Sequence, residues 1–202
     1  MKKLLLITAI TATNFSTIAQ YSETNHPYIK GHIGIIKAQN VVESDNQYKS
    51  NPNFIGIAAL GYNIKDNFRA DLSFDRYLNL RFSAANNFYE SRVRIKVSSL
   101  LLNFYLDVGE IYGCKMFLGL GGGASRFNIK ITFSDTTNNQ TFTNRITQGN
   151  EFTYGLYAGT HYELKPGIHG ELMYSYKNLG IIREGGVKLK AHNITTGIRF
   201  DL

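Results

Sequence analysis

Apolar and polar residues alternate one by one along much of this chain, which is the pattern of β-strands that bury only one face. In the clearest segment, residues 68–77, apolar side chains alternate with Arg69, Asp71, Ser73 and Asp75. Eight such segments can be read: Tyr28–Ala38, Phe54–Ile64, Phe68–Tyr77, Val93–Asp107, Lys115–Phe127, Phe152–Leu164, Ile168–Tyr176 and Val187 to Leu202. The pattern therefore predicts an all-β fold.

The alternation continues to the last residue. Ile198, Phe200 and Leu202 alternate with Gly197 and two charged residues. An amphipathic strand without a polar tail needs a neighbour on each side, and a closed antiparallel barrel supplies both. We therefore expect the C-terminal strand to close a barrel.

The connections between the eight segments alternate in length. Short connections are 65–67, 108–114 and 165–167, and the long, polar ones are 39–53, 78–92, 128–150 and 177–186. Strands that run up and down place all short turns at one end, which is the asymmetry of periplasmic turns and extracellular loops. The sequence thus predicts a transmembrane eight-stranded antiparallel up-and-down β-barrel in a bacterial outer membrane.

The fourth segment has an irregular pattern. Its apolar residues are Val93, Ile95 and Val97 at first, but Leu100 and Leu102 later, so the apolar face changes. Two explanations are open at this point: a bulge near residues 98–99, or a strand that rises beyond the membrane.

A soluble periplasmic barrel or sandwich with an apolar interior is the alternative architecture. The polar face, however, carries many glycines, which suits a narrow lumen in which the backbone crowds opposite side chains. Tyr and Phe also lie near strand ends on the apolar face, as interfacial girdles require. These two features favour the membrane barrel.

The N-terminus resembles a secretory signal. Lys2 and Lys3 precede a short apolar run, and Ala19 follows a stretch of small residues, so we expect residues 1–19 to be removed and residues 20–202 to form the barrel. The apolar run is far shorter than the ~20 residues that a spanning helix needs. The net charge of +7, or +5 without Lys2 and Lys3, does not predict a nucleic-acid partner, and the single Cys114 excludes an internal disulfide.

Several short motifs resemble those of the small eight-stranded outer-membrane barrels of the opacity-protein, OmpA and OmpX type, with surface antigens of intracellular bacteria the nearest in kind. The motifs are 59–62 (ALGY), 102–107 (LNFYLD), 119–123 (GLGGG), 174–176 (YSY) and 197–202 (GIRFDL). The resemblance implies that Gly197, Ile198, Phe200 and Leu202 form the signal that the barrel assembly machinery reads, although family members usually end in Phe. It also implies that outer-membrane lipid, including lipopolysaccharide, surrounds the barrel.

Charged residues of both signs lie on the face that we expect to line the lumen. They are Lys30, Arg69, Asp71, Asp75, Asp107, Glu163, Glu171 and Arg199, with His32 and His169 beside them. Eight strands leave an interior that side chains fill, and buried charges must pair. We therefore expect a closed plug of ion pairs, with a narrow proton or ion path as the alternative.

The sequence predicts no catalytic site, no metal site and no cofactor. None of the five His residues lies in a His-x-Ser pattern, and the 119–123 glycine run lacks the Lys-Ser/Thr of a phosphate loop. Pairs of His and Glu share a strand face at 161 and 163 and at 169 and 171, but lumen hydrogen bonding explains them as well as metal binding does.

The second long loop is basic and aromatic. Its candidate binding residues are Arg81, Phe82, Tyr89, Arg92, Arg94 and Lys96, and this rim could hold outer-leaflet phosphates, host glycans or host surface proteins. The alternative is that these charges only solvate exposed loops. We therefore expect a surface structural protein or antigen, with adhesion through the basic loops as a further hypothesis. A narrow porin-like pore is the second hypothesis, and a lipid A-modifying enzyme is the third.

Overall fold

A computed structural model describes residues 25–38, 41–43, 46–50, 53–85, 89–135, 140–182 and 187–202. The signal sequence expected at residues 1–19 lies outside this range. The strands are β1 (His26–Ala38), β2 (Val41–Glu43), β3 (Asn46–Ser50), β4 (Asn53–Lys65), β5 (Phe68–Ala85), β6 (Tyr89–Ile111), β7 (Cys114–Asp135), β8 (Gln140–Lys165), β9 (Ile168–Ile182) and β10 (Val187–Asp201). Among the described residues there is no helix long and apolar enough to cross a membrane.

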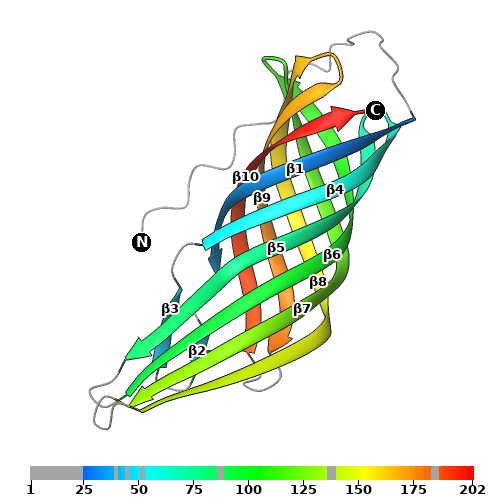
Figure 1. The fold of residues 1–202 in the computed structure, drawn as a ribbon. Coiled ribbons are helices and arrows are strands. Elements are labelled where there is room, and N and C mark those ends of the chain that lie inside the picture. The colour runs from blue at the N-terminus through cyan, green and yellow to red at the C-terminus, as the bar shows by residue number, and fades with distance from the viewer. Residues whose placement is uncertain are drawn as a thin grey trace, which may run out of the picture.

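Eight of these strands form a closed antiparallel barrel, as the alternation predicts (Figure 1). The order around the barrel is β1, β4, β5, β6, β7, β8, β9 and β10, and β10 pairs with β1 from Ala191 to Asp201. The two-residue turns and the C-terminus lie at one end of the barrel, which is uppermost in Figure 1. The small β2–β3 hairpin lies at the other end and pairs with β5.

The four connections predicted to be long loops consist mostly of strand residues, and two of them lengthen the barrel wall. β5 and β6 extend through most of residues 78–92, and β7 and β8 extend through most of residues 128–150, so these hairpins project beyond the rest of the wall (Figure 1). Both strands of each hairpin find a partner, which satisfies backbone groups that a loop would leave to water. The 128–150 connection is thus a projecting β-hairpin.

Of the two explanations predicted for the change of face on β6, the strand that rises beyond the membrane agrees with the structure and the bulge does not. From Ile95 to Tyr105 odd-numbered residues point inward without interruption, so β6 has no bulge at 98–99. The register shift lies instead on β5, between Tyr77 and Leu80. The strand leaves the membrane, and its apolar side chains move from the outer face to the interior.

On the turn side of this change of face, the outer surface of the barrel is apolar. Leu72, Phe74, Leu102 and Leu120 are each about half exposed, while the neighbouring Asp71 is buried. This outward apolar belt, with a charged interior behind it, is the arrangement of a membrane barrel and the reverse of a soluble one. The expected orientation of the two faces is therefore confirmed.

Glycines in the wall make room for large interior side chains. A Cβ added at Gly61 would overlap the phenol ring of Tyr28, and one at Gly121 would overlap the amide of Asn103. The Tyr28 ring and the Asn103 amide are both buried in the barrel interior. The lumen is thus filled partly because the wall lacks side chains at these points.

We expect Gly61→Ala to destabilise the barrel by about 1–3 kcal/mol, because the added methyl group forces Tyr28 out of its site. The matched control is Gly56→Ala on the same strand, since a Cβ there meets nothing within 4 Å. Urea unfolding, followed by heat-modifiable gel migration, measures both. Equal midpoints for the two variants would contradict close packing of Tyr28 against β4.

Candidate functional site

The barrel interior holds a network of paired charges. The Asp71 carboxylate accepts from the Lys30 ammonium at 2.6 Å, from the Tyr28 hydroxyl at 3.0 Å and from the Asn103 amide at 2.8 Å. Lys30 also donates to the Tyr105 hydroxyl at 3.1 Å. All five side chains are buried, so each charge has the partners that burial requires.

A second carboxylate, Glu171, connects three basic side chains. The Arg199 guanidinium lies 3.2 Å from it, His32 lies 3.0 Å away, and Arg69 lies 3.9 Å away. Arg69 continues the network to Asp107 at 3.7 Å. The guanidinium of Arg69 also lies over the ring of Phe117, so aromatic faces help to hold the cations.

Two further ion-pair groups lie at the ends of this network. At the turn end, Asp201 contacts His169 at 2.8 Å, Arg199 at 3.0 Å and His26 at 3.3 Å. Towards the loop end, Asp75 is paired with Lys177 and both are buried.

Seven of the eight predicted lumen charges therefore lie inside the barrel with an oppositely charged partner. They are Lys30, Arg69, Asp71, Asp75, Asp107, Glu171 and Arg199. Glu163 does not join them: it is exposed at the turn end of β8, and the described residues form no ion pair with it. Strand alternation cannot show where the lumen ends, and Glu163 lies beyond that point.

Lys177 and Asp201 also belong to the interior, where the sequence pattern did not predict them. Residue 177 begins the connection 177–186 that the sequence predicts as a long polar loop, whereas β9 continues to Ile182. Its inward position follows from the alternation of Met173 and Ser175, both buried, so a longer strand would have placed it correctly.

An apolar cluster fills the loop-side half of the interior. Every barrel strand contributes at least one buried side chain to it, and its members include Ile36, Ile55, Tyr77, Leu80, Ile95, Val97, Phe127, Leu179 and Leu189. Among the described residues, this apolar packing lies on the loop side of the charged network, and we expect it to hinder the passage of water and ions.

We therefore expect the purified protein to pass little current after reconstitution into planar bilayers. Single-channel recording measures this, with a known open porin as the positive control. Large, stable, voltage-independent channels would contradict a filled interior and would favour narrow-pore transport.

We also expect Lys30→Met to destabilise the barrel by about 3–5 kcal/mol, because it leaves the Asp71 carboxylate buried without its cation. Urea unfolding in detergent measures the loss. The double variant Lys30→Met/Asp71→Asn removes both charges and should lose less than Lys30→Met alone. A double variant that is less stable than the single one would show that Asp71 is stabilised mainly by its neutral donors.

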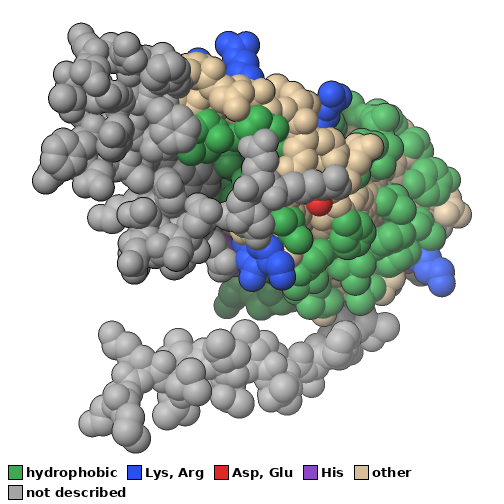
Figure 2. All heavy atoms as spheres, turned by 90° about the horizontal axis from the view of Figure 1, so that it is seen from below, with side chains coloured by type: hydrophobic (Ala, Val, Ile, Leu, Met, Phe, Trp, Pro, Cys, Tyr) green, Lys and Arg blue, Asp and Glu red, His purple; other side chains and the backbone are tan. Residues whose placement is uncertain are grey.

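On the loop side of the apolar belt, the outer wall of β5–β8 carries a second cluster of charged residues. We call it the basic face, and it consists of Arg76, Arg94, Lys96, Arg126, Lys130 and Arg145. Viewed from the loop end, hydrophobic side chains cover much of the outer wall, and Lys and Arg side chains protrude at its margin (Figure 2). Four of these six cations, with Asn128 and Thr147, line one shallow depression, and no described carboxylate lines it.

The upper part of the basic face is a row of directly opposed cations. Arg94 is paired in register with Lys130, and Lys130 is paired with Arg145 on the next strand. On the other side, Arg94 is paired with the backbone position of Arg81. Like charges directly opposite each other destabilise a sheet. Packing does not require such a row, and an anion that spans the strands would remove the repulsion.

The predicted loop residues are only partly described. Arg94 and Lys96 lie on strand β6 rather than in a loop, and both are exposed on the basic face. Arg81 and Phe82 lie on β5, and Tyr89 and Arg92 lie on β6, but their side chains are outside the described part of the structure. The remaining cations come from β5, β7 and β8, and only their register brings them beside β6.

The His, Cys, Asp and Glu residues of the described ranges contain no group of three or more that could hold a metal ion. The buried histidines are paired with carboxylates, as His161 is with Asp107 at 3.0 Å. The charged clusters of the described residues are thus the ion pairs of the interior and the cations of the basic face.

The fold and the two charged clusters can now be compared with known proteins. A family model described as an outer membrane protein beta-barrel domain matches residues 4–200. The chain belongs to this family. It is accordingly an integral β-barrel of the bacterial outer membrane.

Related sequences come from Rickettsia. A protein of Rickettsia bellii named "Putative adhesin" is 29% identical over 231 residues that cover 100% of both chains. A Rickettsia conorii protein of the same name is 31% identical over 76% of this chain and 70% of its own length.

Solved structures of small outer-membrane barrels share the fold. Neisserial surface protein A is 16% identical with a TM-score of 0.59, covering 87% of this chain and 97% of that one. Ail, the attachment invasion locus protein of Yersinia pestis, is 18% identical with a TM-score of 0.52, covering 87% of this chain and 99% of that one. These likenesses establish the barrel architecture.

Proposed function

We propose that this outer-membrane barrel is a non-enzymatic surface adhesin whose basic face binds an anionic polymer on a host cell. The observation that carries the proposal is the upper row of opposed cations formed by Arg94, Lys130 and Arg145, with Lys96 beside it. The names of the Rickettsia relatives support the same class of function.

The geometry of the upper row favours a linear polyanion over a small ion. The cations lie on neighbouring strands, which are ~4.8 Å apart, so charges repeat across a nearly flat surface rather than converging on one point. A sulfated glycan presents anionic groups along its length and can contact several strands at once. Because the β5–β8 hairpins project beyond the rest of the wall, such a polymer reaches this surface without entering the barrel.

The interior does not support the two other functions considered. The charged network and the apolar cluster above it fill the space that a pore needs. Four described histidines, His26, His32, His161 and His169, are paired with carboxylates inside the barrel or at its turn end, away from the outer leaflet where lipid A modification takes place. The fifth, His192, forms a hydrogen bond with the Tyr174 hydroxyl. The exposed surface therefore accounts for function better than the interior does.

The test replaces Arg94, Lys96, Lys130 and Arg145 by Gln. Because the contacts are exposed and electrostatic, binding of the folded protein to immobilised heparin should fall at least tenfold, and wild-type binding should weaken steeply between 0.1 M and 1 M salt, where the Debye length shrinks from ~10 to ~3 Å. Heat-modifiable gel migration checks that the variant is folded.

The matched control is Lys65→Gln/Lys115→Gln/Lys165→Gln, which removes exposed cations at the turn end of the same barrel. Its heparin binding should equal that of the wild type. Unchanged binding by the upper-row variant would refute the proposed adhesin surface, and equal losses in both variants would reduce the interaction to net charge.

A further inference from the structure

The basic face has a lower part with a composition of its own. Two rows of paired residues cross the outer wall where it leaves the membrane. The first row is apolar and runs through Phe74, Leu100, Ala124 and Phe152 on β5, β6, β7 and β8. The second row lies one outward position nearer the loops and runs through Arg76, Ser98 and Arg126.

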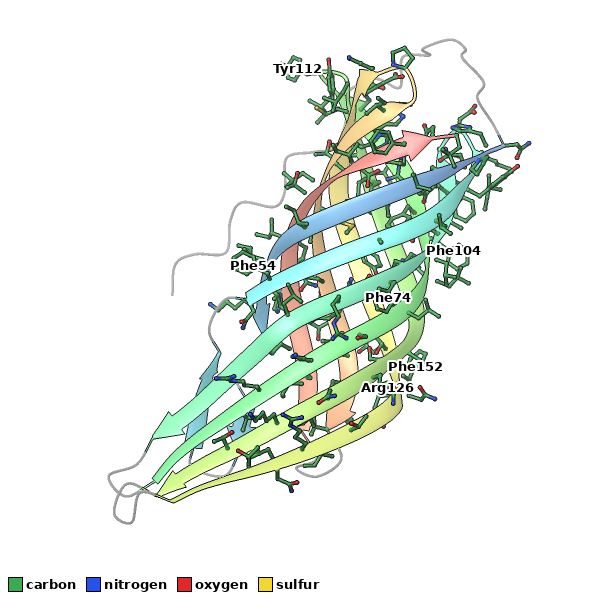
Figure 3. All side chains as sticks on the ribbon, in the orientation of Figure 1. Phe54, Phe74, Phe104, Tyr112, Arg126 and Phe152 are labelled. Carbon is green, nitrogen blue, oxygen red and sulfur yellow. The ribbon has the colours of Figure 1, made fainter. Side chains whose placement is uncertain are left out.

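Residues of both rows line one depression, and Phe152 lies outside its lining. Its volume is about 590 Å³, and its lining runs from Phe74 and Leu100 at one side to Arg76 and Arg126 at the other, with no carboxylate among the described residues. Figure 3 shows Phe152 and Arg126 projecting outward from neighbouring strands. The groove is apolar at one row of paired residues and cationic at the next. It therefore matches a molecule that has an apolar part directly beside an anionic part.

The charge arrangement suits one phosphate group. Arg76 and Arg126 stand two strands apart, so their backbones are about 10 Å from each other. Two arginine side chains are long enough to reach across this distance from both sides. Arg76 already donates a hydrogen bond to Ser98 between them, so this hydroxyl and guanidinium are held at the centre of the row. Arginine is the residue that recognises phosphate with two parallel hydrogen bonds.

The apolar row distinguishes this site from the upper row. A sulfated glycan has no apolar part to place against Phe74, Leu100 and Ala124. A lipid of the outer leaflet has both an acyl chain and an adjoining phosphate. We infer that the lower groove binds a phosphorylated lipid of the outer leaflet, with its phosphate between Arg76 and Arg126 and an acyl chain along the apolar row. This site goes beyond the proposed adhesin function and depends on a different pair of cations, Arg76 and Arg126, although Lys96 lines both depressions.

The test uses the full mature chain, folded in maltoside micelles, which contain no phosphate. Native mass spectrometry counts the molecules of dioleoyl phosphatidic acid bound, with dioleoylglycerol and inorganic phosphate as separate probes. The wild type should bind phosphatidic acid well above dioleoylglycerol and inorganic phosphate. Arg76→Gln/Arg126→Gln should weaken that binding by about tenfold or more, because charge-assisted hydrogen bonds are lost.

Two further variants keep the result interpretable. The single variant Arg126→Gln should show a smaller loss of phosphatidic acid binding, and it spares the Arg76–Ser98 hydrogen bond if the double variant folds poorly. Lys65→Gln/Lys115→Gln removes the same charge from the turn end and should bind phosphatidic acid as the wild type does.

Three outcomes would overturn the inference. Equal binding of phosphatidic acid by the wild type and by both arginine variants would show that lipid meets only the general apolar belt. If inorganic phosphate displaced phosphatidic acid when both were present at the same concentration, the site would be assigned to free phosphate. Loss of heparin binding in Arg76→Gln/Arg126→Gln, with phosphatidic acid binding intact, would assign the lower row to the adhesin surface instead. Heparin binding by the upper-row variant tests the proposed function separately.

Discussion

Closure of the sheet between β1 and β10 is the constraint on which the rest of this structure depends. Hydrocarbon offers no partner to backbone N–H and C=O groups, so a strand that spans a membrane must be paired on both sides. Once eight strands close, the interior is too narrow for a wide channel and is filled by side chains. Lys30, Asp71, Arg69 and Glu171 are buried as a consequence, and their ion pairs compensate for the loss of water.

The reversal of faces along β5–β8 produces the candidate binding surface. Side chains on a strand alternate strictly, so moving the apolar set from the outside to the inside moves the polar set outward at the same point. On β6 this change occurs between Leu100, which faces lipid, and Val97, which is buried in the apolar cluster. The basic face is therefore tied to the apolar cluster that supports it: the cations are outside because Ile95, Phe127 and Ile129 are inside.

This arrangement separates two kinds of charge by their surroundings. Interior cations such as Lys30 and Arg199 are matched by carboxylates and stabilise a rigid barrel. Cations of the basic face, such as Lys130 and Arg145, stand opposite one another across the sheet, where like charges repel. A protein whose interior is closed and neutralised, and whose unmatched charge is displayed on projecting strands, is suited to binding at its surface.

Local sequence determined the eight strands, their up-and-down order, the short turns and the side that faces lipid, because strand alternation and turn residues are short-range signals. It also determined which charges enter the lumen, except at the barrel's limits, where Glu163 is exposed and Lys177 is buried. Only the tertiary structure decided how far β5–β8 extend, where the apolar side chains change face, and which cations from separate strands share a row. Those properties depend on register between residues as distant as Arg94 and Arg145, and no local pattern in the chain encodes that register.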